Sequence, residues 1–542
     1  MPHDVVILGG GANGLGAARD CALRGLRVLL LERGDLAGGA TGASSGMIHG
    51  GPRYLLTGRK VTRHAAQDSG TIQRIAPHLL FRIPFLLPLA GAGPRPTLRE
   101  RASHYATEAF FSAYDRYQPL KRGKPSTRLS ADELYRLEPG LVPGLHGAVT
   151  FDEWGIDAHR LCVANALAAK EAGAEVRCWT EAVALERADG RVRGVRWVDA
   201  VTGAAGLAEA PVVVNATGAW SPGLARRSGL TVPMRPGKGV HLVLDRRLCD
   251  YGIICQAIDG RLLFAYPHED ETWIGTTDDD AFGDPDDQEA LADEVEYLLE
   301  AAASRLPAVR QARLVRAFWG LRTTLHARGP NEDALSRDHA LIDHAGEGAA
   351  GLLSFVGGKL ASYRAQAEEV TDRVLALQGR TPVACRTGEL PLPGGEGPVD
   401  AAALAERFGV AGPVARRVAY RHGARAEAVL RLTAEDARLR LVVCREAGLL
   451  AAEVVHCVRH ELVRRLRDLR SRCRLATGGC GGLDCARVAA QLAARELGWS
   501  AERTRAELAD LLEVGWRERR AVLDGAQLAQ EELLRGAHWG IG

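Results

Sequence analysis

The stretch VVILGGGANGLGAARDCALRGLRVLLLE, residues 5–32, decides the fold of this chain. An apolar run, Val5–Leu8, leads into a glycine-rich turn, residues 15–24 follow with helical spacing, and a second apolar run covers Val28–Leu31. The order strand, turn, helix, strand is typical of the first unit of a dinucleotide-binding α/β fold. We therefore predict an α/β chain built around a parallel sheet.

The turn carries the residues that a pyrophosphate needs. Gly9, Gly11 and Gly14 fit the spacing G-x-G-x-x-G. The first glycine permits a tight turn, the second lets the backbone approach a pyrophosphate at the helix N-terminus, and the third lets helix and strand pack closely. Glu32 ends the second apolar run, where a carboxylate accepts hydrogen bonds from ribose hydroxyls. The sequence predicts that these residues bind a dinucleotide.

Two later apolar runs also end in glycine turns, 212–214 before NATGAW and 352–356 before GGK. They indicate one nucleotide-binding domain assembled from distant pieces, which favours FAD over NAD, although periodicity alone leaves that choice open. We expect a discontinuous Rossmann-like FAD domain over about 1–85, 150–235 and 335–385, a β-rich substrate cap over about 86–149 and 236–334, a linker over 386–400 and a helical C-terminal domain over 401–542.

Composition excludes some partners. The 542 residues are too many for one hydrophobic core, and Lys plus Arg (69) nearly balances Asp plus Glu (67), which argues against nucleic acid. We see neither a signal peptide nor an apolar run of about 18 residues. The apolar segment 79–89 contains Arg82 and two prolines, which favours buried strands over membrane contact. We expect a cytoplasmic protein that at most touches the inner face of the cell membrane.

Cysteine is distributed unevenly along the chain. After the segment LPLPGGEGP, residues 390–398, the sequence is rich in Ala, Arg, Leu and Glu with helical periodicity. Of eleven cysteines, the first six are scattered from Cys21 to Cys385 and are expected to be free thiols. The other five crowd into the helical region, as Cys444, Cys457, Cys473, Cys480 and Cys485.

Several ordered motifs carry a family resemblance. Residues 18–55 resemble the start of the FAD-dependent glycerol-3-phosphate dehydrogenases, and NATGAW, IGTTD, GLRTT, LSRDHALI and GGKLASYR continue the resemblance to residue 364. The resemblance implies an FAD domain capped by a substrate domain, hydride transfer from the secondary alcohol of sn-glycerol 3-phosphate to flavin, and dihydroxyacetone phosphate as product. It also implies electron transfer to a quinone, directly or through partner subunits, by a homo-oligomer or a subunit of a complex.

The resemblance places cationic and polar side chains around the substrate. They are Arg53 and Tyr54 in HGGPRYL, Thr276 in IGTTD, Arg322 in GLRTT, Arg337 in LSRDH and Lys359 in GGK. A dianionic phosphate needs fixed cationic donors, which arginine supplies as a planar fork and lysine as a point charge. Lys359, at the end of a buried strand, could also stabilise the charge of reduced flavin.

The catalytic candidates are Arg322 and two histidines. His49 in IHGG and His241 in GKGVHL are considered for accepting the alcohol proton, because neutral imidazole suits that task near neutral pH. A structural role for either histidine leaves the base unassigned. By family analogy, further contacts to the cofactor come from the loop and turn residues Thr41, Ser44, Ser45, Ala216, Gly218, Gly357 and Gly358.

The cysteine-rich segment resembles a bacterioferritin-associated-ferredoxin-like module of the anaerobic large subunit, which uses a C-x-C pair and a C-x4-C pair. Cys444 matches the first of these positions and Cys480 and Cys485 the last two, and Glu446 stands where the second cysteine is expected. Four thiolates suit an iron–sulfur cluster, and a carboxylate is a poor replacement. The alternatives are a cluster completed by Cys457 or Cys473 and a helical module with free thiols, so the electron acceptor stays open.

Two other functions fit the same motifs. A related flavoprotein that oxidises an amino acid or a 2-hydroxy acid would share the glycine turns and the fold. A non-catalytic flavin or iron–sulfur scaffold for electron transfer would bind flavin that no small substrate reduces. The number of cationic candidates favours a phosphorylated substrate over both alternatives.

Overall fold

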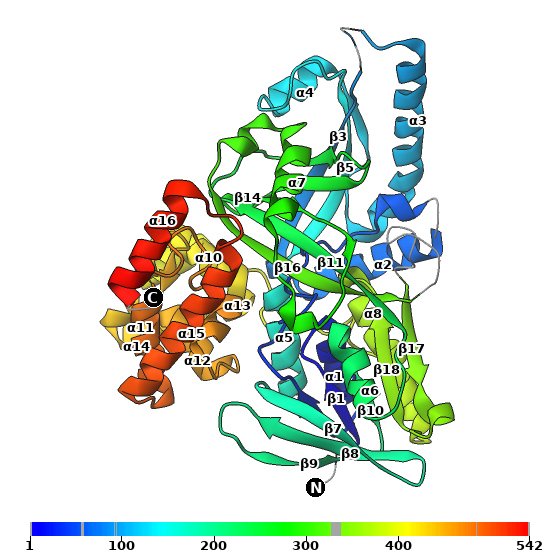
Figure 1. Ribbon diagram of the computed structural model, residues 1–542, viewed down its shortest axis with the longest axis vertical. Helices are drawn as coiled ribbons and strands as arrows, with labels where there is room; N and C mark the ends of the chain where they lie inside the picture. Colours follow the sequence, from blue (N-terminus) through cyan, green and yellow to red (C-terminus); the bar gives the residue numbers. More distant parts are fainter. Residues whose placement is uncertain are drawn as a thin grey trace.

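The computed structural model describes residues 3–55, 59–91, 93, 95–326, 338–483 and 485–539. Within these ranges the side chains of residues 53, 54, 59–61, 538 and 539 lie outside the description. Figure 1 shows an α/β body of two stacked parts, with the C-terminal helices against one side. The predicted fold class is confirmed, and the sheets show how the distant segments meet.

The nucleotide-binding sheet is the one in the lower half of Figure 1 that contains β1, β10, β17 and β18. Among the described residues it has six strands in the order β17-β18-β10-β1-β2-β6, all parallel to their neighbours except β17, which is antiparallel to β18. Its strands are β1 (Val5–Leu8), β2 (Val28–Leu31), β6 (Glu175–Arg177), β10 (Val213–Asn215), β17 (His339–Asp343) and β18 (Leu352–Gly357). The two N-terminal strands cover the residues that the apolar runs predict, and the later segments do join this sheet.

Three helices form one apolar layer with this sheet. They are α1 (Ala12–Leu23), α5 (Ala158–Glu171) and α8 (Tyr363–Leu377). Their buried faces are rich in alanine and small residues, which allows α1 to lie against both α5 and α8. Gly16 illustrates the close approach, because a Cβ there would lie 3.0 Å from the Tyr363 ring. The helix that follows the glycine turn is therefore fixed from both sides.

The upper sheet forms the cap. Its described strands follow the order β15-β11-β14-β13-β12-β3-β5-β4, and β16 pairs with β11. The strands are β3 (Leu80–Pro88), β4 (Thr127–Leu129), β5 (Ala148–Ile156), β11 (Met234–Leu244), β12 (Gly252–Gln256), β13 (Leu262–His268), β14 (Glu271–Gly275), β15 (Asp279–Asp280) and β16 (Leu314–Leu325). The apolar segment 79–89 becomes β3, which pairs with β5 along its whole length and confirms the expected buried strands.

The remaining elements of the α/β body surround these sheets. They are α2 (Arg59–Ile75), α3 (Leu98–Tyr114), α4 (Ala131–Leu137), α6 (Ser221–Arg227), α7 (Ala292–Ala303) and a small antiparallel sheet of β7 (Thr180–Ala188), β8 (Arg191–Asp199) and β9 (Ala205–Glu209). Capping boxes begin two of the cap helices, at Thr97 with Glu100 and at Ser130 with Glu133. Figure 1 places α3 and α4 at the far end of the cap, away from the nucleotide-binding sheet.

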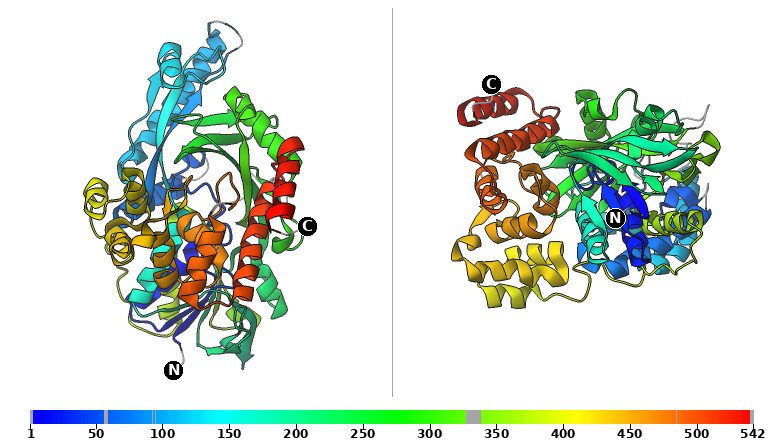
Figure 2. Two further views of the ribbon diagram at one scale, coloured as in Figure 1. Left: turned by 90° about the vertical axis from the view of Figure 1, so that its left-hand side faces the viewer. Right: turned by 90° about the horizontal axis from the view of Figure 1, so that it is seen from below.

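The C-terminal domain is helical, as predicted. Its elements are α9 (Ala401–Phe408), α10 (Gly412–His422), α11 (Ala426–Glu435), β19 (Val442–Cys444), β20 (Leu449–Leu450), α12 (Ala451–His460), α13 (Leu469–Cys473), α14 (Ala486–Leu497), α15 (Ala501–Arg519) and α16 (Gly525–Leu534). Figure 2 shows this domain lying along both the cap and the nucleotide-binding part. In the described part of the chain, no helix has the length and hydrophobicity that crossing a membrane requires.

Buried ion pairs join the C-terminal domain to the nucleotide-binding part. Arg472 on α13 is completely buried and donates to both carboxylate oxygens of Asp35, at 2.8 and 2.9 Å. Asp35 lies in the loop after β2, close to the glycine turn. Arg160 on α5 likewise donates to both carboxylate oxygens of Glu461, at 2.6 and 2.9 Å. Separating the domains would leave buried charges without their partners, which costs free energy. These ion pairs therefore favour one orientation of the two domains.

We predict that Asp35→Ala lowers the free energy of unfolding by about 3–5 kcal/mol, because it leaves the Arg472 guanidinium buried without its carboxylate. Urea unfolding of the holoprotein, followed by circular dichroism, would measure the loss. The double variant Asp35→Ala/Arg472→Met is the matched control, since it leaves no uncompensated charge and should recover most of the stability. A double variant no more stable than Asp35→Ala would contradict the assignment.

Candidate functional site

The glycine turn after β1 is built by backbone contacts. Gly9 has φ +109°, and a Cβ there would lie 2.5 Å from the carbonyl oxygen of Ala216. A Cβ at Gly14 would lie 2.0 Å from the carbonyl oxygen of Gly9. At Gly11, the residue before α1, a Cβ would meet only the Thr41 hydroxyl, at 3.2 Å. Packing thus requires the first and third glycines, and the second leaves backbone accessible to a pyrophosphate.

Glu32 organises the same turn. Its carboxylate accepts hydrogen bonds from the backbone N–H groups of Gly10, at 2.5 Å, and Gly34, at 2.8 Å. Burial raises the pKa of Glu32, and the two backbone donors act in the opposite direction. A carboxylate has about four lone-pair positions, so Glu32 can hold the turn and still accept from a ribose hydroxyl. Its position therefore fits the predicted cofactor contact.

The loop of residues 41–46 connects the cofactor side to the cap. The Thr41 hydroxyl accepts from the backbone N–H of Ala12 at the start of α1, 3.2 Å away. Ser44 donates to the carbonyl of Thr41, at 2.8 Å, and this bond forms the turn. The Ser45 hydroxyl is 2.8 Å from Nε2 of His241 on β11. The structure thus brings two predicted residues from opposite domains into contact.

His241 lies deep in the cap, with 3% of its surface exposed. Its ring stacks on Phe318, with centroids 4.8 Å apart, and a Cβ at Gly275 would lie 2.3 Å from its Cδ2. Burial, with a smaller effect from the charge of Arg322, lowers the pKa of His241 to about 3. Within the described residues its Nδ1 has no hydrogen-bond partner. The imidazole is neutral near pH 7 and keeps one nitrogen available.

Arg322 is held in place by the IGTTD segment. Its guanidinium donates to Asp278 at 2.9 Å, to the Thr276 hydroxyl at 3.1 Å and to the Thr277 carbonyl at 3.1 Å. A Cβ at Gly239 would lie 2.6 Å from both the guanidinium and the Thr276 hydroxyl, so glycine makes room for them. Arg322 is therefore oriented before any ligand arrives, and Asp278 balances part of its charge.

Two further glycine turns lie at the carboxyl ends of β10, which is beside β1, and of β18, which is beside β10. Ala216, directly after β10, donates its N–H to the carbonyl of Leu8, at 2.9 Å, and Gly218 follows with φ +61°. Gly357 ends β18 and Gly358 follows it, with φ +82° and +90°, and Cβ atoms there would meet the Asp338 carbonyl and the Gln366 amide, at 2.3 and 2.5 Å. Ligands of open α/β sheets bind at this edge.

Lys359 and His49 lie on separate segments, Lys359 shortly after β18 and His49 in a loop beside β5. Lys359 precedes a short 3-10 helix, Leu360–Ser362, and its Nζ is buried. His49 is half-buried in the loop after Ile48, whose N–H donates to the Trp154 carbonyl at 2.9 Å. Three predicted substrate residues cannot be placed, because the side chains of Arg53 and Tyr54 and the whole of Arg337 lie outside the described residues.

Three cysteines of the C-terminal domain come together. The thiol of Cys485 interacts with the thiols of both Cys444 and Cys480. The hydrogen bond from Cys485 lowers the pKa of Cys444 to about 7, and the same bond raises the pKa of Cys485. Of these two thiols, Cys444 therefore ionises at lower pH than Cys485.

A fourth thiolate does not complete this group. Cys473 interacts with Cys457 and donates to the carbonyl of Leu469 at 3.2 Å, and burial keeps the pKa of Cys457 well above its usual value. The carboxylate of Glu446 lies on the adjacent turn, where a Cβ at Gly478 would be 2.1 Å from its Oε2. Three thiols and a carboxylate do not fit a cluster that requires four thiolates.

The site also contains contacts that the sequence did not indicate. They are the pairing of Asp278 with Arg322, the stacking of Phe318 on His241, and the room that Gly239 and Gly275 leave for these side chains. The position of Asp278 inside the IGTTD motif could have indicated that it lies in the same pocket as Thr276. For the other three residues, only the pairing of β11 with β16 and β14 reveals the contact.

Comparisons with known proteins identify the family of this chain. Residues 4–364 match the family described as FAD dependent oxidoreductase, and residues 385–504 match the C-terminal domain of alpha-glycerophosphate oxidase. The chain is 34% identical to a subunit of the anaerobic glycerol-3-phosphate dehydrogenase of Escherichia coli K12, over 99% of this chain and 96% of that protein. It is 32% identical to the corresponding subunit from Haloferax volcanii, over 98% and 89% of the two chains.

A solved structure shares the fold. The glycerol-3-phosphate dehydrogenase from Bacillus halodurans, complexed with FAD, superposes with a TM-score of 0.76 at 23% identity and covers 97% of this chain and 96% of its own. The superposition therefore extends over the nucleotide-binding part, the cap and the C-terminal helices together.

The thiol group gives a prediction for pH dependence. Cys444 should be alkylated with an apparent pKa of about 7, because the Cys485 thiol stabilises its thiolate, so the rate rises as pH increases through neutrality. Cys485→Ala should move the midpoint up toward the ordinary thiol value. Mass spectrometry of peptides after brief treatment with a small alkylating reagent would follow each cysteine separately. An unchanged midpoint in Cys485→Ala is the result that excludes this interaction.

Proposed function

This chain belongs to the family of FAD-dependent glycerol-3-phosphate dehydrogenases, and we propose that it oxidises sn-glycerol 3-phosphate to dihydroxyacetone phosphate. We further propose that the electrons leave to a quinone or to a partner protein. The near full-length match to relatives named as subunits of an anaerobic glycerol-3-phosphate dehydrogenase supports both the substrate and a partner chain.

The proposal needs a cofactor, and the residues present fit FAD. The cofactor would lie along one edge of the sheet. It would be held there by the glycine turn, the start of α1, Glu32, the loop 41–46 and the turns after β10 and β18. FAD would accept the hydride from the secondary alcohol of the substrate. The chain would supply binding, orientation and proton transfer around that step.

One observation carries the proposal, the grouping of His241, Arg322 and Thr276 beside the loop that contains Ser45. A guanidinium with a fixed orientation can bind an anionic oxygen in a defined direction. A neutral imidazole can accept the proton of the substrate hydroxyl. The two groups come from adjacent strands, β11 and β16, so their separation is set by the sheet.

We assign the proton acceptor to Nδ1 of His241. If Nε2–H donates to the Ser45 hydroxyl, the lone pair of Nδ1 is the one left for the substrate. Burial and Arg322 make this imidazole a weak base before substrate binds. A phosphate dianion paired with Arg322 would offset the arginine charge and raise the pKa of His241 at the moment when the base is needed.

Other predicted residues complete the proposed pocket. Arg53, Tyr54, Arg337 and Lys359 would share the remaining phosphate oxygens, and His49 is the second candidate for the base. Electron transfer through an iron–sulfur cluster is left out of the proposed reaction, because only three thiols meet in the C-terminal domain within the described residues.

The test of the proposal is anaerobic reduction of the bound flavin. Mixing the purified yellow protein with sn-glycerol 3-phosphate should bleach the flavin absorption, and glycerol, glycine and 2-hydroxyglutarate should leave it unchanged. Bleaching by glycine or 2-hydroxyglutarate instead would assign the chain to a related flavoprotein activity. Bleaching by none of the four compounds would overturn the dehydrogenase proposal and favour an electron-transfer scaffold.

The role of His241 can be tested separately. His241→Asn should slow flavin reduction by about 10²- to 10⁴-fold, the usual contribution of a general base, with the flavin content unchanged. His268→Asn is a matched control, because His268 is half-buried, stacks on Trp273 with ring centroids 4.0 Å apart and has a pKa lowered, mainly by desolvation, to about 4. Stopped-flow rates per bound flavin would compare them, and equal rates in the two variants would move the base elsewhere.

A further inference from the structure

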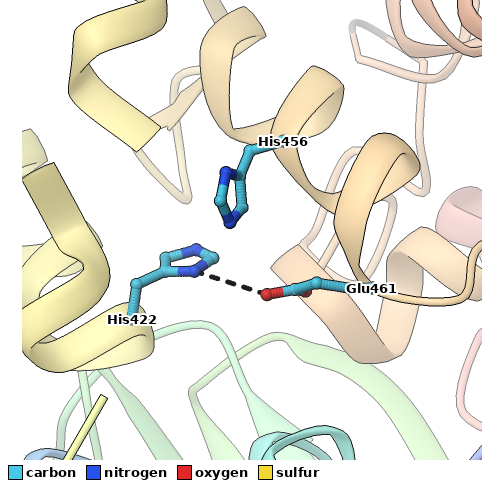
Figure 3. Close-up of side chains that lie close together, drawn as sticks. All are labelled: His422, His456 and Glu461. Carbon is cyan, nitrogen blue, oxygen red and sulfur yellow. Dashed lines mark ion pairs between the residues drawn. The ribbon is translucent and has the colours of Figure 1, made fainter. Parts of the chain in front are cut away.

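A cluster of two histidines and a glutamate lies in the C-terminal domain, outside the proposed catalytic pocket. His422 ends α10, His456 lies on α12, and Glu461 follows the last residue of α12. Figure 3 shows the two imidazole rings and the carboxylate pointing toward one another. One ligand atom from each residue lies within 4.8 Å of the other two. None of these residues contributes to the site described above.

The distance between one pair of these atoms suits two ligands of a metal ion. Nδ1 of His422 is 3.4 Å from Oε1 of Glu461, which is longer than the usual N–H···O distance of about 2.7–3.2 Å. Zinc binds imidazole nitrogen and carboxylate oxygen at about 2.0–2.2 Å in tetrahedral geometry, which separates two ligand atoms by about 3.4 Å. The pair therefore stands at the separation that a tetrahedral zinc ion would impose.

Residues around the cluster orient these ligands. Nε2 of His422 faces Oε1 of the fully buried Glu453, at 3.4 Å, and Glu453 is paired with Arg417. Metal-bound histidines commonly direct the second ring nitrogen to a carboxylate in this way, and metal-bound carboxylates are themselves hydrogen-bonded. Arg160 supplies the latter contact, with its two bonds to Glu461 at 2.6 and 2.9 Å, and its Nη2 also lies 3.4 Å from Nδ1 of His422. Each carboxylate oxygen keeps a second lone pair for a cation.

The cluster is reachable from solvent on one side. His456 is half-buried, and the exposed His460 lies one helical turn further along α12, with the two ring centroids 4.9 Å apart. Residues at positions i and i+4 of a helix share one face, as in known pairs of metal-binding histidines. His460 or a water molecule can therefore take a fourth position. Two imidazoles and one carboxylate with a fourth open position form a ligand set that suits zinc.

We propose that His422, His456 and Glu461 bind one zinc ion that joins α10 to α12. Through Arg160, which holds Glu461 from α5, the ion also supports the contact between the C-terminal domain and the nucleotide-binding part. The competing interpretation is an ion-pair network without metal. In that network Arg160 balances the charge of Glu461, Arg417 balances that of Glu453, and His422 lies between the two carboxylates. The first interpretation predicts that each chain binds one zinc ion, and the second predicts that it binds none at this cluster.

The experiment uses flavin-loaded protein from which a chelator has removed bound metal. Zn²⁺ is titrated into it in the presence of a chromophoric chelator that competes for the ion, and the flavin content is measured before and after. One ion per chain is expected for the wild type. His456→Ala should lose this stoichiometric binding, and because its side chain is half-exposed the fold should be retained. Glu453→Gln, which keeps the shape of the side chain that orients His422, should weaken binding by about 10- to 100-fold. His3→Ala is the control, since His3 forms a similar pair with Glu175, at 3.6 Å, away from the cluster.

The thiol group is a second place where zinc could bind, so the test separates the two. Titration with Co²⁺ in place of Zn²⁺ should give a visible spectrum of nitrogen and oxygen ligation without a thiolate charge-transfer band. Binding should persist in Cys444→Ser/Cys485→Ser. The proposal is overturned if His456→Ala binds zinc like the wild type, if the cysteine variant alone loses the ion, or if the wild type binds none.

Discussion

The contact between the glycine turn after β1 and the turn after β10 is the constraint on which the rest of the structure depends. Gly9 has no room for a side chain because the Ala216 carbonyl occupies it, and Gly14 has none because of the Gly9 carbonyl. Two backbone segments that are about 200 residues apart in sequence are thereby packed against each other. β18 then adds beside β10, and a single edge of the sheet receives three glycine turns from three distant segments. A cofactor site of this kind needs close backbone approach, and glycine is the residue that permits it.

Much of this core could be predicted from sequence, because it depends on local signals. Apolar runs gave β1 and β2, glycine turns marked the ends of the later strands, and helical periodicity identified the C-terminal domain. The family motifs indicated Arg322 and Thr276 as residues of one pocket, and the structure brings them into hydrogen-bond contact. Their assignment to the substrate remains a proposal, since the contact alone identifies no ligand.

The sequence could not predict contacts between segments that lie far apart in the chain, because no periodic pattern links them. Arg472 reaches Asp35 across 437 positions, and nothing in either segment indicates its partner. The crowded cysteines give another example, since spacing alone left Cys457 and Cys473 as candidates to complete a cluster. In the fold these two interact with each other, and Glu446 occupies the turn beside the other three. Burial and pairing decide such questions, and both are properties of the packed chain.

The strand β16 shows how these separate regions act on one another. Successive side chains of a strand point to opposite faces, so Arg316, Phe318, Gly320 and Arg322 share one face. Arg316 donates to the Thr477 carbonyl in the cysteine-rich turn, at 3.0 Å, and Phe318 stacks on His241. A Cβ at Gly320 would lie 2.7 Å from the Cβ of Ala43 in the cofactor loop, and Arg322 is held by Thr276 and Asp278. Along its length, β16 thus contacts the cysteine-rich turn at Thr477, the His241 imidazole and the cofactor loop, and it carries the Arg322 guanidinium. Because a strand cannot shift one of these side chains without moving the next, the position of the C-terminal domain and the geometry of the pocket are determined together.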